Sequence, residues 1–122
     1  MMHRVPPLPD RPALLLDLDG TLLDIAPTPD AVVVPAGLRA DLARLRAVLD
    51  DALAIVTGRA VEQVEALLPG VAYAVAGEHG GAIRFAPGAA LTRADLPPLP
   101  PAWLEAAQRL VAMHPGTFAS AL

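Results

Sequence analysis

The chain has 122 residues, enough for one domain with a single hydrophobic core. Hydrophobic residues make up 54% and charged residues 18%, and no apolar run reaches the roughly 18 residues of a membrane span. The absence of cysteine excludes disulfides, thiolate nucleophiles and cysteine-based zinc sites. Because the net charge is −4 and the arginines are scattered, neither nucleic acid nor an anionic membrane is expected as a partner.

Residues 1–12 are predicted to form an N-terminal tail. This segment contains two Arg and four Pro and lacks the apolar middle section of a secretory signal. We therefore expect a cytoplasmic protein. All nine basic residues of the chain are Arg, so there is no lysine.

The first predicted strand covers residues 13–18, an apolar run interrupted only by Asp17 and typical of a strand buried on both faces. Residues 21–35 contain three prolines and predict an irregular loop. Pro35 suits the first turn of a helix, since proline lacks only a donor that is unpaired there. That helix is expected to end near Asp50, with leucines 38, 42, 45 and 49 on one face.

Two further strands are predicted at residues 53–56 and 71–76. Between them, apolar residues at positions 61, 64, 67 and 68 mark an amphipathic helix, which Pro69 and Gly70 end. The order strand, helix, strand, helix, strand implies right-handed crossovers and a parallel sheet with helices on both faces. The predicted fold class is therefore α/β.

The character of the sequence changes after the third strand. Residues 82–85 and 89–92 flank an Ala-Pro-Gly turn and predict a small hairpin. A proline-rich spacer then precedes a helix expected at 102–113, and residues 117–122 are predicted to begin another strand.

Polar residues follow each of the three predicted strands. They are Asp17, Asp19, Gly20 and Thr21 after the first, Thr57, Gly58 and Arg59 after the second, and Glu78 and His79 in a glycine-rich loop after the third. In an open parallel sheet, ligands bind outside the carboxyl ends of the strands. Two carboxylates this close together are costly unless a cation lies between them, and such oxygen ligands suit Mg²⁺.

This set of side chains also suits phosphoryl transfer. The Asp17 carboxylate can attack phosphorus and hold the phosphoryl group covalently, while Asp19 protonates the leaving oxygen and later activates water. Gly20 lets the backbone approach phosphate closely, and the hydroxyls of Thr21 and Thr57 can donate to its oxygens.

Simpler interpretations stay open for each motif. Asp-x-Asp-Gly is also a common turn sequence, and Thr57 could cap the helix that follows it. For Arg59, a surface ion pair and a substrate contact are both open. A histidine in a glycine-rich loop, such as His79, is often only a solvated turn residue.

The segment Asp17-Leu18-Asp19-Gly20-Thr21-Leu22 resembles the first motif of the haloacid dehalogenase superfamily. That resemblance implies a Rossmann-like core, with the first aspartate as nucleophile and the second as acid/base. It also implies that Mg²⁺ binds the carboxylate of Asp17 and the backbone carbonyl of Asp19. Thr57 falls where the superfamily has the Ser or Thr of its second motif.

One branch of this superfamily has all three loops in the same order and spacing. The Ile25-Ala26-Pro27 segment, the Thr-Gly-Arg loop and the Gly-Glu-His-Gly loop together resemble trehalose-6-phosphate phosphatases. The resemblance implies trehalose 6-phosphate as substrate, with residues 77–80, which include Glu78 and His79, near its sugar side. Arg59 is also predicted to bind the substrate. It also implies that residues 13–81 form the N-terminal half of the core and that residues 82–122 begin an α+β cap.

Two departures from that family affect the expected activity. The family uses a third motif with Lys or Arg and an acidic fourth motif, and neither is found before Leu122. We therefore expect this chain to be the N-terminal part of a phosphatase. The complete enzyme is expected to be a monomer. Two alternatives remain: a phosphatase of another sugar phosphate, or a non-catalytic remnant whose unpaired first strand associates with another chain.

Overall fold

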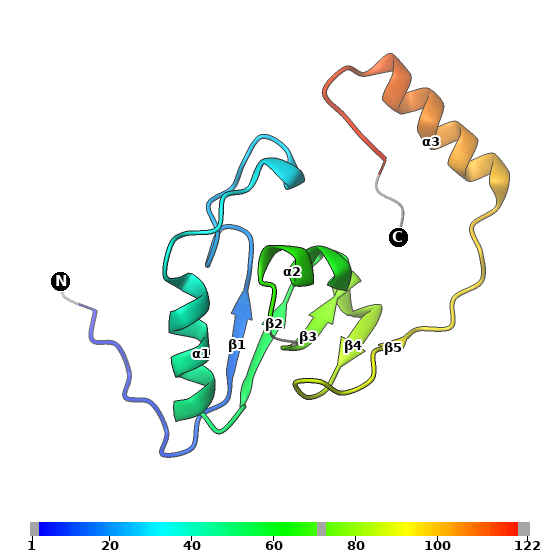
Figure 1. Ribbon diagram of the computed structural model, residues 1–122. Coiled ribbons are helices and arrows are strands. Elements are labelled where there is room, and N and C mark those ends of the chain that lie inside the picture. The colour runs from blue at the N-terminus through cyan, green and yellow to red at the C-terminus, as the bar shows by residue number, and fades with distance from the viewer. Residues whose placement is uncertain (1–2, 71–72, 120–122) are drawn as a thin grey trace.

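The computed structural model describes residues 3–70 and 73–119, which form a five-stranded mixed sheet with helices (Figure 1). The strands are β1 (Leu14–Asp17), β2 (Leu53–Val56), β3 (Ala74–Gly77), β4 (Ala82–Arg84) and β5 (Thr92–Arg93). The helices are α1 (Leu38–Val48), α2 (Val61–Leu67) and α3 (Pro101–Met113), with short 3-10 turns at Pro29–Ala31 and Glu78–Gly80. The predicted α/β fold is confirmed.

The strands lie in chain order across the sheet. β1, β2 and β3 are parallel, as predicted, with Asp17 opposite Val56 and Ile55 opposite Val75. β4 then pairs antiparallel with β3, and β5 pairs antiparallel with β4. The predicted hairpin therefore exists, and it continues the same sheet. Because β1, β2 and β3 run in one direction, their carboxyl ends share one edge, where the loops after them meet.

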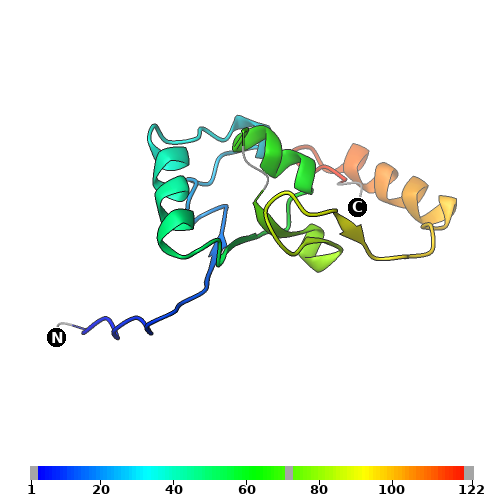
Figure 2. The same cartoon turned by 60° about the horizontal axis from the view of Figure 1, so that its bottom comes forward.

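Both early helices cover the same face of the sheet. Figure 2 shows α1 (teal) and α2 (green) on one side of the strands. On that side, Ile55 of β2 packs in one buried cluster with Leu42 of α1 and Val61 of α2. On the other side, Leu15 is 70% exposed and Val56 is 42% exposed. The prediction of helices on both faces is therefore wrong for the described residues: sequential parallel strands joined by right-handed crossovers put both helices on one side.

Several element boundaries differ from the predicted ones. α1 begins at Leu38 rather than Pro35, because Gly37 has a left-handed φ of 88° immediately before it. The third strand begins at Ala74, and residues 71–72 of the predicted strand lie outside the described part of the chain. Residues 89–91 form an irregular link rather than a strand. Residues 117–119 are not in a strand, and the rest of that predicted strand lies outside the described residues.

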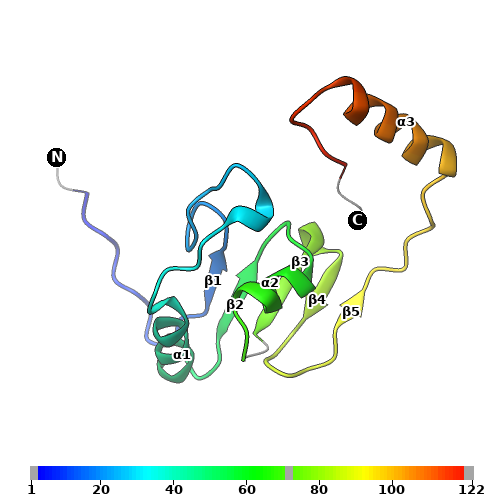
Figure 3. The ribbon, with the colours of Figure 1, turned by 45° about the horizontal axis from the view of Figure 1, so that its top comes forward.

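The segment after β5 lies away from the sheet, with an extended proline-rich link leading to α3 (Figure 3). α3 has no buried residue, and Trp103 is 66% exposed. The division into a core at 13–81 and a cap at 82–122 stays a prediction. Among the described helices, none is long and apolar enough to cross a membrane.

Candidate active site

The loop after β1 is a tight turn built around Leu18. Leu18 is fully buried, and its carbonyl accepts hydrogen bonds from the N–H groups of Leu22 and Leu23 at 3.0 and 2.9 Å. Since side chains alternate along an extended chain, burying Leu18 directs Asp17 and Asp19 together to the opposite side. The loop thus holds both predicted carboxylates at the end of β1.

Two further residues complete this first loop. Gly20 has a φ of 82°, a left-handed conformation that side chains other than glycine rarely adopt. Thr21 Oγ1 donates a hydrogen bond of 3.2 Å to Oδ2 of Asp17. Asp17 and Thr21 are therefore in direct contact at the end of β1, with Gly20 in the turn between them.

The loop after β2 is held by a hydrogen bond to β3 and by a hydrogen bond to its own Thr57 side chain. The Thr57 N–H donates to the Ala76 carbonyl at 2.9 Å, and Thr57 is only 7% exposed. Its Oγ1 accepts the Arg59 N–H at 3.1 Å, a bond within the loop. The N-cap of α2 is Ala60 and has no side-chain cap, so the interpretation of Thr57 as the cap of this helix is wrong. A Cβ on Gly58 would lie 2.5 Å from Cε1 of His79, so the histidine ring covers the backbone at this position.

Arg59 connects this second loop to the first. Its Nε donates to Oδ2 of Asp19 and its Nη2 donates to Oδ1, both at 2.7 Å, while Nη1 donates to the Pro29 carbonyl at 3.0 Å. The Arg59 side chain is only 10% exposed. For Arg59 the sequence left a surface ion pair and a substrate contact open. The structure shows a third arrangement, a part-buried ion pair with Asp19.

This ion pair determines the charge of Asp19. The hydrogen bonds from Arg59 hold the pKa of Asp19 below its ordinary value of 3.8, more than burial raises it, and the arginine charge adds to the effect. The same contact raises the pKa of Arg59 above its ordinary value. In the arrangement described here, Asp19 is therefore an ionised acceptor.

The loop after β3 has an uncommon backbone. Glu78 and His79 have φ values of 54° and 55°, in the left-handed region that non-glycine residues seldom occupy. The Glu78 N–H donates to the Arg59 carbonyl at 2.9 Å, which joins the third loop to the second. The Glu78 carboxylate forms an ion pair with Arg93 of β5, and Arg93 also pairs with Glu62 of α2.

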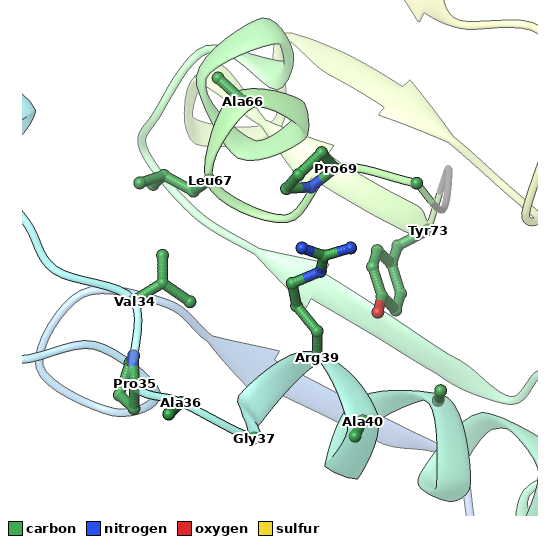
Figure 4. A pocket seen from close by; sticks show the side chains of 12 residues that line it. Val34, Pro35, Ala36, Gly37, Arg39, Ala40, Ala66, Leu67, Pro69 and Tyr73 are labelled. Carbon is green, nitrogen blue, oxygen red and sulfur yellow. The ribbon is translucent and has the colours of Figure 1, made fainter.

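Two hollows lie near these loops and the helical layer. One, of about 540 Å³, is lined by Asp19, Gly58 and Arg59 together with residues 25–29 and Phe118. The other, of about 780 Å³, lies between α1 and α2 and is lined by Arg39, Tyr73 and neighbouring apolar residues (Figure 4). The second hollow contains none of the predicted site residues, so the first is the candidate substrate position.

The residues present fit a hard cation only in part. Among the described residues, no cluster of three or more His, Cys, Asp or Glu side chains could hold a metal ion. Arg59 already binds both carboxylate oxygens of Asp19. The Asp17 carboxylate is exposed, and the Asp19 carbonyl has no hydrogen-bond donor among the described residues. These two oxygens suit Mg²⁺, which commonly completes its shell with water and phosphate.

Two contributors to the site were not found from the sequence. The Pro29 carbonyl accepts a bond from Arg59, and Arg93 holds Glu78 in place. Neither has a motif of its own. Arg93 could be found only through the hairpin register, which puts it opposite Ala82 on the side of the sheet that α2 covers.

The strand order and its loops define a known type of α/β protein. A solved crystal structure described as a trehalose-6-phosphate phosphatase related protein matches with a TM-score of 0.59 at 24% identity, covering 84% of this chain and 41% of that one. This likeness concerns the fold. The family model described as trehalose-phosphatase matches residues 15–110, so the chain belongs to the trehalose-phosphatase family.

Two curated relatives show the same family relationship. A probable trehalose-phosphate phosphatase of Sinorhizobium fredii (strain NBRC 101917 / NGR234) is 51% identical over 71 residues, covering 58% of this chain and 27% of that protein. The trehalose-6-phosphate phosphatase of Escherichia coli (strain K12) is 40% identical over 79 residues, covering 65% and 30%. The chain thus spans less than a third of the length of either relative.

Replacing Gly77 by alanine is expected to destabilise the third loop. A Cβ there would lie 2.8 Å from Cγ2 of Val61 and 2.9 Å from the Arg59 carbonyl oxygen, neither of which can move freely. We expect Gly77→Ala to lower the free energy of unfolding by about 1–3 kcal/mol in urea denaturation. Gly58→Ala is the matched control and should cost less, since its obstruction is the exposed His79 ring, which can rotate away. An equal loss in both variants would contradict this packing.

The Asp19 ion pair is expected to make stability depend on pH. Because the folded-state pKa lies below the ordinary value of 3.8, the pair stabilises the fold above that pH and is lost as pH falls through the lower folded value. The difference in unfolding free energy between wild type and Asp19→Asn should be largest at neutral pH and shrink in acid. Urea denaturation across a pH series measures it.

The control for that experiment is Asp24→Asn. Asp24 is exposed and has no ion pair among the described residues. This variant should differ from wild type by about the same small amount at every pH. A constant difference for Asp19→Asn as well would show that the contact with Arg59 does not form in solution.

Proposed function

We propose that the loops after β1 and β2 carry the nucleophile side of a Mg²⁺-dependent trehalose-6-phosphate phosphatase, with Asp17 as nucleophile and Asp19 as acid/base. One observation supports this most strongly. The sheet register and the contacts of Arg59 bring Asp17, Asp19 and Thr57 to the same edge of the sheet. Membership of the trehalose-phosphatase family supports the reaction class. The cytoplasmic location expected from the sequence stays part of this proposal.

The proposed reaction has two balanced steps. An oxygen of the Asp17 carboxylate attacks phosphorus, the bond from phosphorus to the sugar oxygen breaks, and Asp19 gives that oxygen a proton. Water then attacks the aspartyl phosphate and loses a proton to Asp19, which releases phosphate and restores both carboxyl groups. Trehalose and inorganic phosphate are the products.

Hydroxyl and backbone groups around Asp17 are proposed to hold the phosphoryl oxygens. The Thr21 hydroxyl already bonds to Asp17 and is therefore within reach of a group attached to it. Thr57 lies at the neighbouring strand end. Gly20 and Gly58 are proposed to offer their backbone to the phosphate, which at Gly58 requires the His79 ring to turn aside. Preorganised donors of this kind stabilise charge that develops during phosphoryl transfer.

Arg59 has a specific consequence for this mechanism. Asp19 must carry a proton to act as an acid, but the contact with Arg59 favours its ionised form. A substrate phosphate offers the guanidinium an alternative bidentate acceptor. We propose that Arg59 exchanges Asp19 for the substrate when the hollow beside it is filled, which frees Asp19 for proton transfer.

The sugar side of the substrate is proposed to lie toward the third loop. Glu78 and His79 are the candidates, and His79 lies against the backbone of Gly58. Glu78 is held by Arg93, which limits its freedom to turn toward a ligand. A phosphatase of another sugar phosphate would use the same carboxylates, so the identity of the sugar rests on the family relationship.

Mg²⁺ is proposed to bind the Asp17 carboxylate and the Asp19 carbonyl. When bound, it would offset the repulsion between a carboxylate nucleophile and an anionic phosphate. The protein groups that hold it are hard oxygens, which Mg²⁺ prefers.

The substrate and the nucleophile are tested by phosphate release from a panel of sugar phosphates. We expect the 122-residue chain to prefer trehalose 6-phosphate, and Asp17→Asn to release no more phosphate than a protein-free blank, because an amide is a far weaker nucleophile than a carboxylate. Asp24→Asn is the control and should keep wild-type activity. If wild type and Asp17→Asn are equally silent, the chain is not an enzyme by itself.

The metal requirement is tested by chelation. Phosphate release should stop when EDTA removes divalent cations and should return when Mg²⁺ is added in excess. Activity that persists in EDTA would contradict the proposed cation site while leaving the role of Asp17 intact.

A further inference from the structure

The hollow between α1 and α2 combines apolar walls with hydrogen-bond donors. Its volume of about 780 Å³ is typical of a site for a small molecule. The residues that line it come from the start of α1 and the segment before it, from the end of α2, and from Tyr73. None of them is Asp or Glu, and Arg39 carries a positive charge. This hollow shares no residue with the one beside Asp19.

Arg39 offers its guanidinium to this hollow. The other arginines of α1 each form an ion pair with an aspartate, whereas Arg39 has no carboxylate partner among the described residues. Its Nη2 would lie 3.6 Å from a Cβ on Gly70, so the side chain extends from α1 to the chain just after α2. Figure 4 shows the guanidinium reaching from α1 toward Pro69, with the Tyr73 ring beside it. Its donors are therefore available to a ligand in the hollow.

Tyr73 supplies a second donor from a buried position. The residue is only 4% exposed, and the Arg46 guanidinium lies over its ring at 5.5 Å from the centroid, which holds the ring in place. No buried side-chain nitrogen or oxygen of the described residues lacks a hydrogen-bond partner, and the Tyr73 hydroxyl has none among them. This hydroxyl therefore faces the open hollow that Tyr73 lines.

The start of α1 adds positive potential to the same hollow. Gly37, the N-cap residue, has no side chain that could cap the helix. The N–H groups of Arg39 and Ala40 have no acceptor within the described part of the chain. Unpaired N–H groups and the helix dipole make such an end favourable for an anion. Gly37, Arg39 and Ala40 all line the hollow.

We propose that this hollow binds a small organic phosphate. A guanidinium binds two phosphate oxygens at once, which leaves a third oxygen for the Tyr73 hydroxyl, while the start of α1 favours the negative charge. A carboxylate has only two oxygens in one plane and would satisfy fewer of these donors. The organic part of the ligand would rest on the apolar wall formed by Val34, Leu67 and Pro69.

Binding is tested with phenylphosphonate, an analogue of a phosphate ester that a phosphatase cannot hydrolyse. In an NMR titration of the full chain in EDTA, we expect the amide signals around Gly37 and Gly70 to shift. The dissociation constant should be on the order of 1 mM, because water competes for the exposed Arg39. Shifts at residues 17–21 and 57–59 instead, or none at all, would overturn the proposal.

The same titration of Asp17→Asn separates this site from the proposed phosphatase. Asp17 does not line the hollow, so this variant should bind phenylphosphonate with unchanged affinity. The result does not depend on whether the chain hydrolyses any substrate. A loss of binding in Asp17→Asn would place the ligand in the loops after β1 and β2 and overturn the proposal.

Two variants test the donors. Arg39→Met and Tyr73→Phe should each raise the dissociation constant about fivefold by removing hydrogen bonds to the phosphate. Tyr73→Phe keeps the buried ring, so an unchanged amide spectrum without ligand will show that the fold is retained. Arg109→Met is the matched control, since Arg109 is an exposed arginine of α3 outside the hollow. Equal weakening in Arg109→Met would reduce the effect to net charge and overturn the site.

Inorganic phosphate and benzoate test the class of ligand. Each should bind at least about threefold more weakly than phenylphosphonate, because the first lacks an apolar group for the walls and the second lacks a third oxygen. Equal affinity for inorganic phosphate would overturn the organic part of the assignment. Equal affinity for benzoate would overturn the choice of phosphate over carboxylate.

Discussion

The parallel register of β1, β2 and β3 is the constraint on which the rest of the site depends. With Asp17 opposite Val56 and Ile55 opposite Val75, the carboxyl ends of the three strands lie at one edge of the sheet. A polar loop follows each strand there. The loops are then tied to one another rather than left independent. Arg59 connects the loops, because its side chain binds Asp19 and its carbonyl accepts the Glu78 N–H. A single residue thus contacts all three loops.

A buried ion pair is costly to form and strongly directional once formed. The Asp19 side chain is 35% exposed and that of Arg59 is 10% exposed, so the pair is only partly removed from water. That intermediate exposure is consistent with the proposed exchange of Arg59 from Asp19 to a phosphate. A fully buried pair would resist exchange with substrate, and a fully exposed pair would not hold the loops in register.

Much of the fold could be predicted from the sequence because short apolar runs and helical periodicity are local signals. The runs at 13–18 and 53–56 and the helix after Arg59 needed no knowledge of their partners. The boundary at Gly37 and the link at 89–91 depended on backbone conformation, which composition alone does not fix. Both helices lie on one face because of the order of the strands, and that order depends on the whole sheet rather than on local sequence.

The site shows the same division between local and long-range information. The aspartates of the first loop and the Thr-Gly-Arg loop could be predicted because each motif lies within a few residues. The contacts that orient them join positions far apart in the chain, such as Arg59 with Asp19 and Arg93 with Glu78. The sequence around a charged residue on a short strand does not indicate its ion-pair partner. These ion pairs could therefore be identified only from the folded structure.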